Sequence, residues 1–355
     1  MAGNALQIVG LGASTPIGRN VWASAAAARA GVSGFSEHPY MVDTAGEPMR
    51  IARAPWLAVG LDGSARLGAL LLPAIEEALA PLTELAGNLS LRIGLALGLP
   101  PPRPGQPDAL VDDLLVAIRE RMGNRFVRIA RFEVGHAAGH MAMAAAEAGC
   151  ARDAFDACVV AGIDSYLAPE TLEWVEACDQ LHGGGPLNNA WGFIPGEAAG
   201  AVLLGTPRLA QLCGIAPLAE LVSVGIGMES RLIKTGEVCV GEGLTQAFRA
   251  ALQGLAPGEQ VHNVYCDLNG EPYRADEFGF ATLRTGERFR AASDFVAPAD
   301  CWGDVGAAGS LLHVALAVIA CRKRYANGPL SMVWGSSESG ERGAVLVRCA
   351  EPAGG

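Results

Sequence analysis

The sequence predicts an α/β fold in which two duplicated halves are packed as one unit. A helix–strand pattern occurs twice, in residues 135–165 and again in residues 303–339. Each copy opens with Ala-Ala-Gly, continues as an alanine-rich apolar helix, and then reads as a buried strand that ends at glycine and serine. Apolar residues make up 50% of the 355 residues, which is enough for a large core. An internal repeat of this kind indicates a duplicated α/β unit, with halves at residues 1–210 and 211–355.

The first half contains short apolar runs separated by turn-forming residues. A buried strand is expected over 6–12, and an alanine-rich helix over 21–30 is stopped by Gly31. Residues 99–108 are rich in proline and must form a loop, because proline sustains neither helix nor central strand. The other elements expected before and after the first repeat copy are a helix over 66–79, a strand over 91–97, a helix over 110–122, and a glycine-rich turn leading into a strand within 191–204.

The second half repeats the alternation. Pro207 is taken as the end of the first half, and a strand over 219–227 begins the second. A helix over 243–255 and a strand over 261–268 follow, and this strand reaches the polar tip Asn269-Gly270-Glu271. The second repeat copy precedes a final strand over 343–348. Because no low-complexity linker separates the halves, we expect them to share one packed unit.

Composition restricts the classes of function. The net charge is −11 with acidic and basic residues intermixed, which argues against non-specific nucleic-acid binding. The nine cysteines are scattered without a CxxC pair, so we expect packed thiols in a reducing compartment. The first residues lack a basic segment followed by a long apolar run, and we expect no signal peptide and no membrane span. These observations favour a cytoplasmic protein.

Four segments together resemble the β-ketoacyl synthase family of the thiolase-like superfamily. They are the opening strand and TPxG turn at Ile8–Gly18, the GFIPGEAAGAVLL stretch at Gly192–Leu204, the GAAG helix start at Gly306–Gly309, and the AGIDS strand end at Ala161–Ser165. The resemblance implies a thiolase-like fold of five layers, αβαβα, built from two similar halves. It also implies a homodimer or a heterodimer with a synthase-like subunit.

The chemistry of that family requires a cysteine at a buried helix start, which carries the acyl chain, and two histidines that bind the thioester oxygen. Aligned on the shared motifs, His136 stands where the cysteine belongs. Asn269 stands where the first histidine belongs, and Gly303 where the second belongs. The resemblance therefore implies a degenerate site with all three catalytic positions replaced, and no residue is predicted with confidence to be catalytic.

Other uses of these positions stay open. His136 and His140 are four residues apart and would share one helix face. They could form a metal or acid–base pair, with Asp267, Glu271 or Asp304 as a third ligand, or they could be polar filling of an old cavity. Because no HExxH pattern is present, we predict neither a metal nor a cofactor.

A new site beside His136 is a further alternative, and it would use Cys301, Glu271 and Asp304. The competing interpretation makes Asp304 a helix N-cap and Cys301 a packed thiol. Bulky Trp302 and Met141 are expected to fill part of the old pocket.

Two surface segments also have alternative interpretations. Residues 119–131 hold five arginines, which could receive the phosphopantetheine of a carrier protein or an acidic partner, or could simply be a solvated face. The proline-rich residues 100–107 could be a PxxP ligand or a stiff surface loop. The glycines of residues 192–200 are expected to serve backbone packing, because no Walker pattern follows them.

The favoured function is that of a catalytically silent, ketosynthase-like protein that acts by binding. It would be a partner subunit of an active synthase, a scaffold, or an adaptor for a secreted effector in a bacterial gene cluster. The expected partners are proteins, with an acyl carrier protein or an effector among them, and not nucleic acid. The first alternative is an acyl-processing transferase or hydrolase with a site rebuilt around His136, Asp267, Glu271 and Asp304. The second is an active ketoacyl synthase with an unrecognised nucleophile, for which Cys301 is the candidate.

Overall fold

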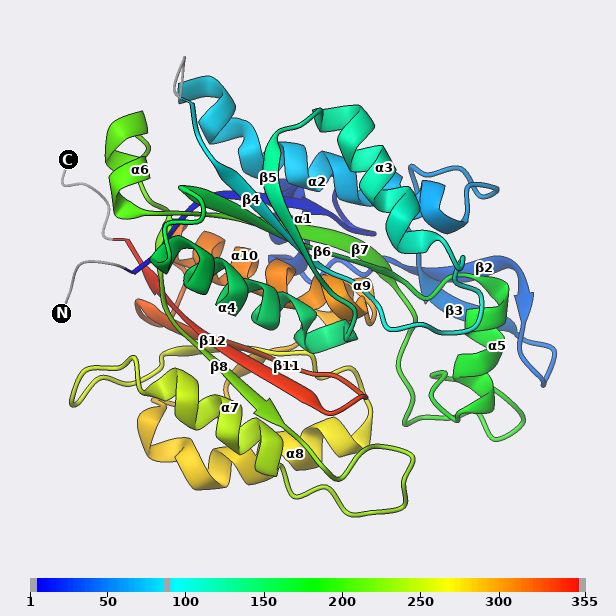
Figure 1. Cartoon of the computed structure of the whole chain (residues 1–355). Helices are drawn as coiled ribbons and strands as arrows, with labels where there is room; N and C mark the ends of the chain where they lie inside the picture. The colour runs from blue at the N-terminus through cyan, green and yellow to red at the C-terminus, as the bar shows by residue number, and fades with distance from the viewer. Residues whose placement is uncertain (1–4, 86–89, 351–355) are drawn as a thin grey trace.

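The computed structural model describes residues 5–85 and 90–350 and contains one mixed sheet of ten strands (Figure 1). The strands are β1 (Gln7–Ser14), β2 (Phe35–Val42), β3 (Pro48–Ala52), β4 (Ile93–Gly98), β5 (Phe126–Phe132), β6 (Ala157–Ser165), β7 (Glu197–Gly205), β8 (Ala219–Met228), β9 (Asn263–Tyr265), β10 (Phe295–Val296), β11 (Leu330–Ser336) and β12 (Glu341–Cys349). The helices are α1 (Val21–Arg29), α2 (Gly63–Leu85), α3 (Leu110–Met122), α4 (Ala138–Ala151), α5 (Pro169–Ala177), α6 (Pro207–Cys213), α7 (Glu242–Leu252), α8 (Pro272–Thr285), α9 (Ala299–Trp302) and α10 (Gly309–Arg322).

The strand order contains the duplication that the sequence predicts. The ten strands run β10-β9-β11-β12-β8-β1-β7-β6-β4-β5. Read outward from the junction of β1 and β8, each half contains an antiparallel pair, β1 with β7 and β8 with β12. Each half then ends in parallel pairs, β6-β4-β5 on one side and β11-β9-β10 on the other. The halves join where Gln7 and Ile8 pair with Glu220 and Ala219, so the boundary predicted at residue 210 falls within α6, between them.

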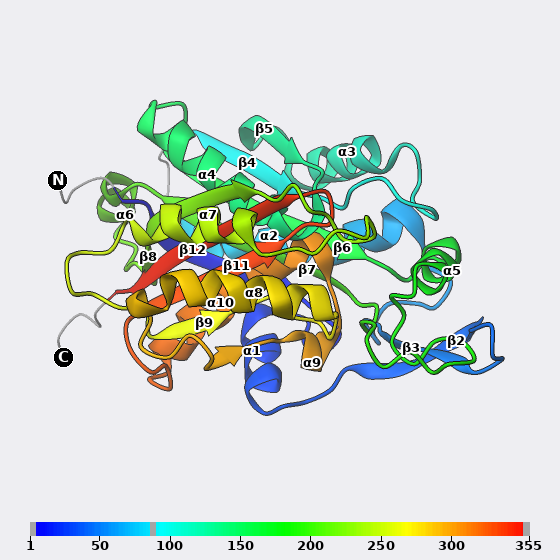
Figure 2. The same cartoon turned by 90° about the horizontal axis from the view of Figure 1, so that it is seen from below.

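The elements stack in five layers, as the resemblance implies (Figure 1). Helices α2 and α3 cover the outer face of the first half-sheet, and α7 and α8 cover the outer face of the second. Helices α4 and α10, which belong to the two repeat copies, lie between the half-sheets and contact strands of both. Figure 2, seen from below, shows α7 and α8 in front of the second half-sheet.

Of the two central helices, α10 is enclosed on all sides, whereas α4 is buried on one side and reaches the surface at Glu147. From Gly309 to Ala320 every residue of α10 is buried, which suits a helix that is hydrophobic around its whole circumference. Helices α4 and α10 come close at Gly139, where an added Cβ would lie 1.9 Å from Ser310 Oγ. Glycine is required at that position because any side chain would separate the helices.

Some predicted boundaries are wrong, and each has a local cause. The helix expected over 66–79 extends over Gly63–Leu85, since Pro73 and Pro81 are tolerated inside it. The strand expected over 261–268 is only Asn263–Tyr265, because the following residues leave the sheet. Pro207 starts α6 at its first turn, capped by Thr206, instead of simply ending the half.

Several elements were not predicted from the sequence at all. Strand β5 lies inside the arginine-rich segment, where alternating charge and apolar residues hid a half-exposed strand. Helix α8 begins at Pro272 directly after the polar tip. Strands β2 and β3 form a separate hairpin beside α5, and several of their side chains are exposed.

The cysteines depart from the expectation of packed thiols at one place. Cys321, near the end of α10, and Cys349, at the end of β12, form a disulfide. Their sequence separation of 28 gave no spacing signal, since tertiary packing brings the two cysteines together. Among the described residues, no helix is both long and apolar enough to cross a membrane.

Candidate functional site

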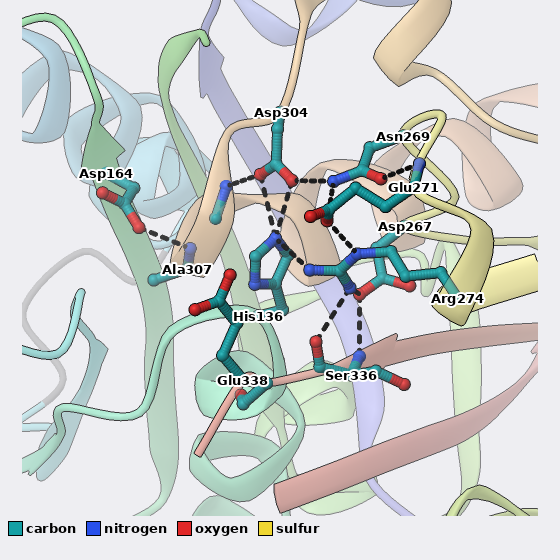
Figure 3. Close-up of polar contacts among 12 residues, drawn as sticks. His136, Asp164, Asp267, Asn269, Glu271, Arg274, Asp304, Ala307, Ser336 and Glu338 are labelled. Carbon is teal, nitrogen blue, oxygen red and sulfur yellow. Dashed lines mark hydrogen bonds and ion pairs between the residues drawn. The ribbon is translucent and has the colours of Figure 1, made fainter. Parts of the chain in front are cut away.

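The starts of the two repeated helices meet at the centre of the molecule. A 3₁₀ turn at Gly135–Ala137 precedes α4, and a matching turn at Gly306–Ala308 precedes α10. The two turns contact each other. Small residues allow this, since a Cβ on Gly162 of β6 would lie 2.3 Å from the carbonyl oxygen of Ala307. Beside the turns lies a buried polar group that we call the central cluster (Figure 3), formed by His136, Asp267, Asn269, Glu271, Arg274 and Asp304.

His136 and Asp304 form the first contact of the central cluster. The Nε2 atom of His136 lies 2.9 Å and 3.0 Å from the two carboxylate oxygens of Asp304. The backbone N–H of Gly306 donates to the same carboxylate at 2.8 Å. Asp304 therefore serves both expected roles, because it caps the turn before α10 and also pairs with His136.

This contact sets the charges of both groups. Burial alone would lower the pKa of His136, but the carboxylate of Asp304 raises it above its ordinary value. Burial alone would raise the pKa of Asp304, and the neighbouring imidazole lowers it below its ordinary value. The contact with Asp304 thus favours the protonated form of His136, against the helix N-terminus, which by itself disfavours that form.

Arg274 is the main cluster residue that the sequence did not reveal. Its guanidinium is fully buried, and Nη1 donates to Asp267 at 2.6 Å and to the carbonyl oxygen of Ser336 at 2.8 Å. Its Nε donates to Glu271 at 3.2 Å. The 3.3 Å approach of its Nη2 to His136 Nε2 brings two donors together, so we count it as a contact and not as a hydrogen bond.

Charge balance explains why Arg274 stays ionised. Burial would lower its pKa, yet Tyr273 and the carboxylates of Asp267 and Glu271 raise it well above the ordinary value. Nothing in a helix sequence separates a buried arginine from an exposed one, because both occupy ordinary polar positions. The one available signal was its place three residues after Glu271, which gives the ion pair at the start of α8.

Asn269 and Glu271 extend the cluster toward the surface. The side-chain amide of Asn269 donates to Asp304 at 2.6 Å and to Glu271 at 2.9 Å. Gln180 then links Glu271, at 2.7 Å, to Glu338, at 2.6 Å. Asn269 thus acts as a fixed hydrogen-bond donor between two carboxylates.

Gly303 cannot be replaced by a residue with a side chain without moving its surroundings. Its φ is +73°, a conformation that L-residues rarely adopt. A Cβ on this residue would lie 2.6 Å from the carbonyl oxygen of Ile194. Position 303 is therefore closed to histidine by both backbone conformation and packing.

His140 does not join His136 in a common site. Its Nε2 faces the carbonyl oxygen of Val333 at 3.3 Å, and burial lowers its pKa to about 4. His313 on α10 is also buried, and its pKa is lowered to about 3. Among the described residues, the grouping suited to a metal ion is Glu229, Cys239 and Glu277, which contains none of the predicted ligands.

Cys301 lies outside the central cluster. It sits in α9, and its Sγ faces the carbonyl oxygen of Ala28 at 3.8 Å. Burial raises the pKa of its thiol, so the reactive thiolate is disfavoured. This environment is that of a packed thiol.

The space left beside the central cluster is very small. His136, Asp267, Asn269, Trp302 and His313 are among the residues that line a cavity of about 20 Å³. One water molecule needs roughly 10–15 Å³ of such space, so the cavity accepts a water and not an acyl chain. Trp302 is among the residues that line this cavity, whereas Met141 is not.

A second buried ion pair supports the cluster from the proline-rich loop. Arg103 pairs with Asp164 at the end of β6 and donates to the carbonyl oxygen of Ser165 at 2.7 Å. The backbone N–H of Ala307 donates to Asp164 at 3.0 Å (Figure 3). The loop of residues 99–108 therefore turns its arginine inward and fixes the turn before α10.

Known proteins resemble this chain in structure but not measurably in sequence. No family model matches it, and no curated protein matches it. A ketosynthase solved with its type II polyketide acyl-carrier protein aligns with a TM-score of 0.80 at 16% identity, covering 98% of this chain and 100% of that chain. A β-ketoacyl synthase from Burkholderia phymatum gives 0.77 at 17% identity, with the same coverage. The ishigamide ketosynthase/chain length factor gives 0.69 at 17% identity, again with 98% and 100% covered.

These alignments confirm the fold predicted from the sequence. The chain has the thiolase-like α/β fold of the ketosynthases over nearly its whole length. At identities of 13–17% they establish the fold alone, and the use of the site must be argued from its own residues.

Proposed function

We propose that this chain is a catalytically silent, ketosynthase-like protein that acts by binding another protein. The observation that carries the proposal is that its central site is occupied by its own side chains. His136 is paired with Asp304, Arg274 neutralises the neighbouring carboxylates, and Gly303 leaves no room for a histidine. A cavity of about 20 Å³ excludes the acyl chain that a condensing enzyme must hold.

The partner we propose is a second thiolase-like chain that docks on strand β5. This strand is at one end of the ten-stranded sheet, and within residues 5–85 and 90–350 it pairs with β4 alone. Its side chains Val127 and Ile129 are 57% and 37% exposed, and Arg128 and Arg131 are exposed beside them. An unpaired edge strand with apolar side chains offers hydrogen-bonding groups to a strand of another chain.

One finding supports that choice of partner. The similar structures include a ketosynthase/chain length factor. A scaffold or an effector adaptor is the alternative within the binding class, and neither needs a thiolase-like partner.

A rebuilt acyl-processing site is the second candidate function. It is favoured by the 2.9 Å contact of His136 with Asp304, since a histidine oriented by a carboxylate is a common general base. The burial of both groups and the small cavity oppose it. The third candidate, a ketoacyl synthase that uses Cys301, is opposed by the raised pKa of that thiol and by its position outside the central cluster.

The test is incubation of the full chain with malonyl- and acyl-thioesters, followed by intact mass and thioester turnover. We expect no covalent adduct and no turnover above the uncatalysed rate. Turnover that disappears in His136→Ala would establish the rebuilt site instead. An adduct that disappears in Cys301→Ala would establish the unrecognised nucleophile, and either result overturns the silent interpretation.

A further inference from the structure

A second hollow, separate from the central cluster, lies between α1 and the β9–β10 edge of the sheet. This groove has a volume of about 460 Å³. Helix α9 lies between this groove and the small cavity beside the central cluster. Its residues Asp300 and Cys301 line the groove, and its residue Trp302 lines the cavity. Figure 2 shows α1, α9 and β9 side by side at this part of the molecule.

The walls of the groove are mainly apolar. Ala25 and Ala28 of α1, Tyr265 of β9, Phe295 of β10 and Leu316 of α10 contribute to them. The small side chains of Ala25 and Ala28 keep the groove open, because larger side chains at these positions of α1 would fill it. The volume falls within the range of roughly 300–1,000 Å³ that is usual for small-molecule sites.

One cation stands at the edge of this groove without an acidic partner. Arg29, in the last turn of α1, places its Cζ 3.8 Å from the centre of the Tyr325 ring. Among residues 5–85 and 90–350, it forms no ion pair with a carboxylate within 4 Å. A guanidinium that is stacked on an aromatic ring keeps its hydrogen-bond donors free for an anion.

The surrounding charge has the same sign. Three consecutive basic residues, Arg322, Lys323 and Arg324, directly precede Tyr325 and are exposed. Lys323 also stacks on Trp22 of α1. Asp300 is the single carboxylate among the described residues that line the groove. In a protein of net charge −11, this local excess of positive charge favours an anionic ligand.

We infer that this groove is a binding site for a single-chain anionic amphiphile. The apolar chain would lie along the alanines of α1 against Tyr265 and Leu316, and the anionic head would meet Arg29 beside Tyr325. The inference concerns a different cavity from the central cluster, and it holds whether or not the central site is silent.

The test is calorimetric titration of the full chain with decanoate below its micelle-forming concentration. Decanol and decyltrimethylammonium are matched probes that share the chain and change only the head. We expect saturable binding of one equivalent of decanoate, and at least tenfold weaker binding of the two other probes, since a hydrogen bond to a charged group is worth roughly 1.5–3 kcal/mol. Failure of decanoate to bind, or tighter binding of the cation, overturns the inference.

Variants locate the ligand. Arg29→Gln removes the charge at the groove and should weaken decanoate binding at least tenfold, whereas Arg119→Gln on the distant α3 makes the same charge change and should not. Ala28→Phe fills the groove and should abolish binding. If Ala28→Phe does not fold, as far-ultraviolet circular dichroism would show, the exposed Arg29→Gln still decides. If wild type and Arg29→Gln bind decanoate with equal affinity, the assignment of the anionic head to Arg29 is wrong.

Asp300 gives a check on the sign of the ligand charge. Its carboxylate repels an anionic head, so Asp300→Asn should keep or strengthen decanoate binding. Loss of binding in Asp300→Asn would indicate recognition of a cation and would contradict the inference.

Discussion

Single residues decide what the centre of this molecule can hold, and Gly303 is the clearest of them. Its positive φ and the nearby carbonyl oxygen of Ile194 exclude a side chain. His136, Asn269 and Asp304 then form a contact network in which each donor meets a carboxylate. A histidine can return to the family position only if the chain around Gly303 rearranges.

Gly303→Ala should therefore destabilise the protein by roughly 1–3 kcal/mol or more, because it adds both backbone strain and a steric clash. The matched control is Gly309→Ala at the start of α10, where the nearest atom to an added Cβ is His313 Cε1 at 3.7 Å. Urea denaturation measures both variants. Equal stability of the two variants would show that Gly303 is not under this constraint.

Arg274 holds the carboxylates of the cluster in place. Arg274→Met leaves Asp267 and Glu271 buried without their cation, and we expect a loss of about 3–5 kcal/mol in the free energy of unfolding. The control Arg121→Met breaks an exposed ion pair with Glu76 and should cost about 0–1 kcal/mol. A loss for Arg274→Met no larger than that of the control would contradict the buried-pair account.

At the scale of elements, the pairing of α4 with α10 makes stability depend on pH. His140 and His313 are buried between apolar surroundings, and their pKa values are lowered to about 4 and about 3. The unfolded chain takes up protons on these residues below about pH 6.5, while the folded chain does not. Each histidine should therefore reduce the folding equilibrium constant about tenfold per pH unit as the pH falls from 6.5 toward 4.

His136 acts in the opposite sense, because Asp304 raises its pKa and its contribution is lost as the pH rises. Urea denaturation at several pH values between 4 and 6.5 gives the slope of the free energy of unfolding against pH. In His313→Leu this slope should correspond to about one proton fewer taken up on unfolding than in wild type. A wild-type slope retained in His313→Leu would contradict the assignment.

Strand β5 is the element from which we expect association. On the proposed docking surface, Val127→Asp with Ile129→Asp should convert a dimer of the wild-type chain into a monomer, because charges on an edge strand oppose pairing. Val116→Asp, on an exposed position of α3, is the control and should stay dimeric. Analytical ultracentrifugation distinguishes them, and a wild-type chain that remains monomeric would contradict self-pairing through β5.

Elements enclosed by the core were predictable from the sequence, and those at the periphery were not. The helix predicted over 110–122 agrees with α3, whose apolar face packs on the core, and the two repeat copies contain α4 with β6 and α10 with β11, whose apolar runs reflect their burial. Strand β5 and helix α8 carry mixed polar and apolar residues, since one side of each is exposed. Their apolar residues therefore showed no clear helical or strand periodicity in the sequence. The disulfide of Cys321 with Cys349 depends on tertiary contact and has no local signal.

At the scale of the whole molecule, the duplication determines where the candidate site lies. The repeat is visible in the sequence, and it is enough to predict a site where the two repeated helices begin. The glycine motifs single out His136, Asn269 and Gly303 as candidate positions, and the fold brings His136 and Asn269 together through Asp304. Arg274 and Gln180 could not be predicted, because their burial depends on how α8 and the segment after α5 pack on the sheet. The fold of a condensing enzyme is thus kept around a centre filled with ion pairs.

The central claim, that this centre is closed to acyl chains, is tested most directly by acylation of the His136→Cys variant. The substitution puts a thiol in the central cluster, in the turn before α4, where an acyl chain can reach it only if the centre is open. After circular dichroism confirms that the variant is folded, it is incubated with an acyl-thioester, and intact mass with peptide mapping locates any adduct. The account predicts no acyl group at the new thiol; acylation of that thiol at a stoichiometry near one would contradict it.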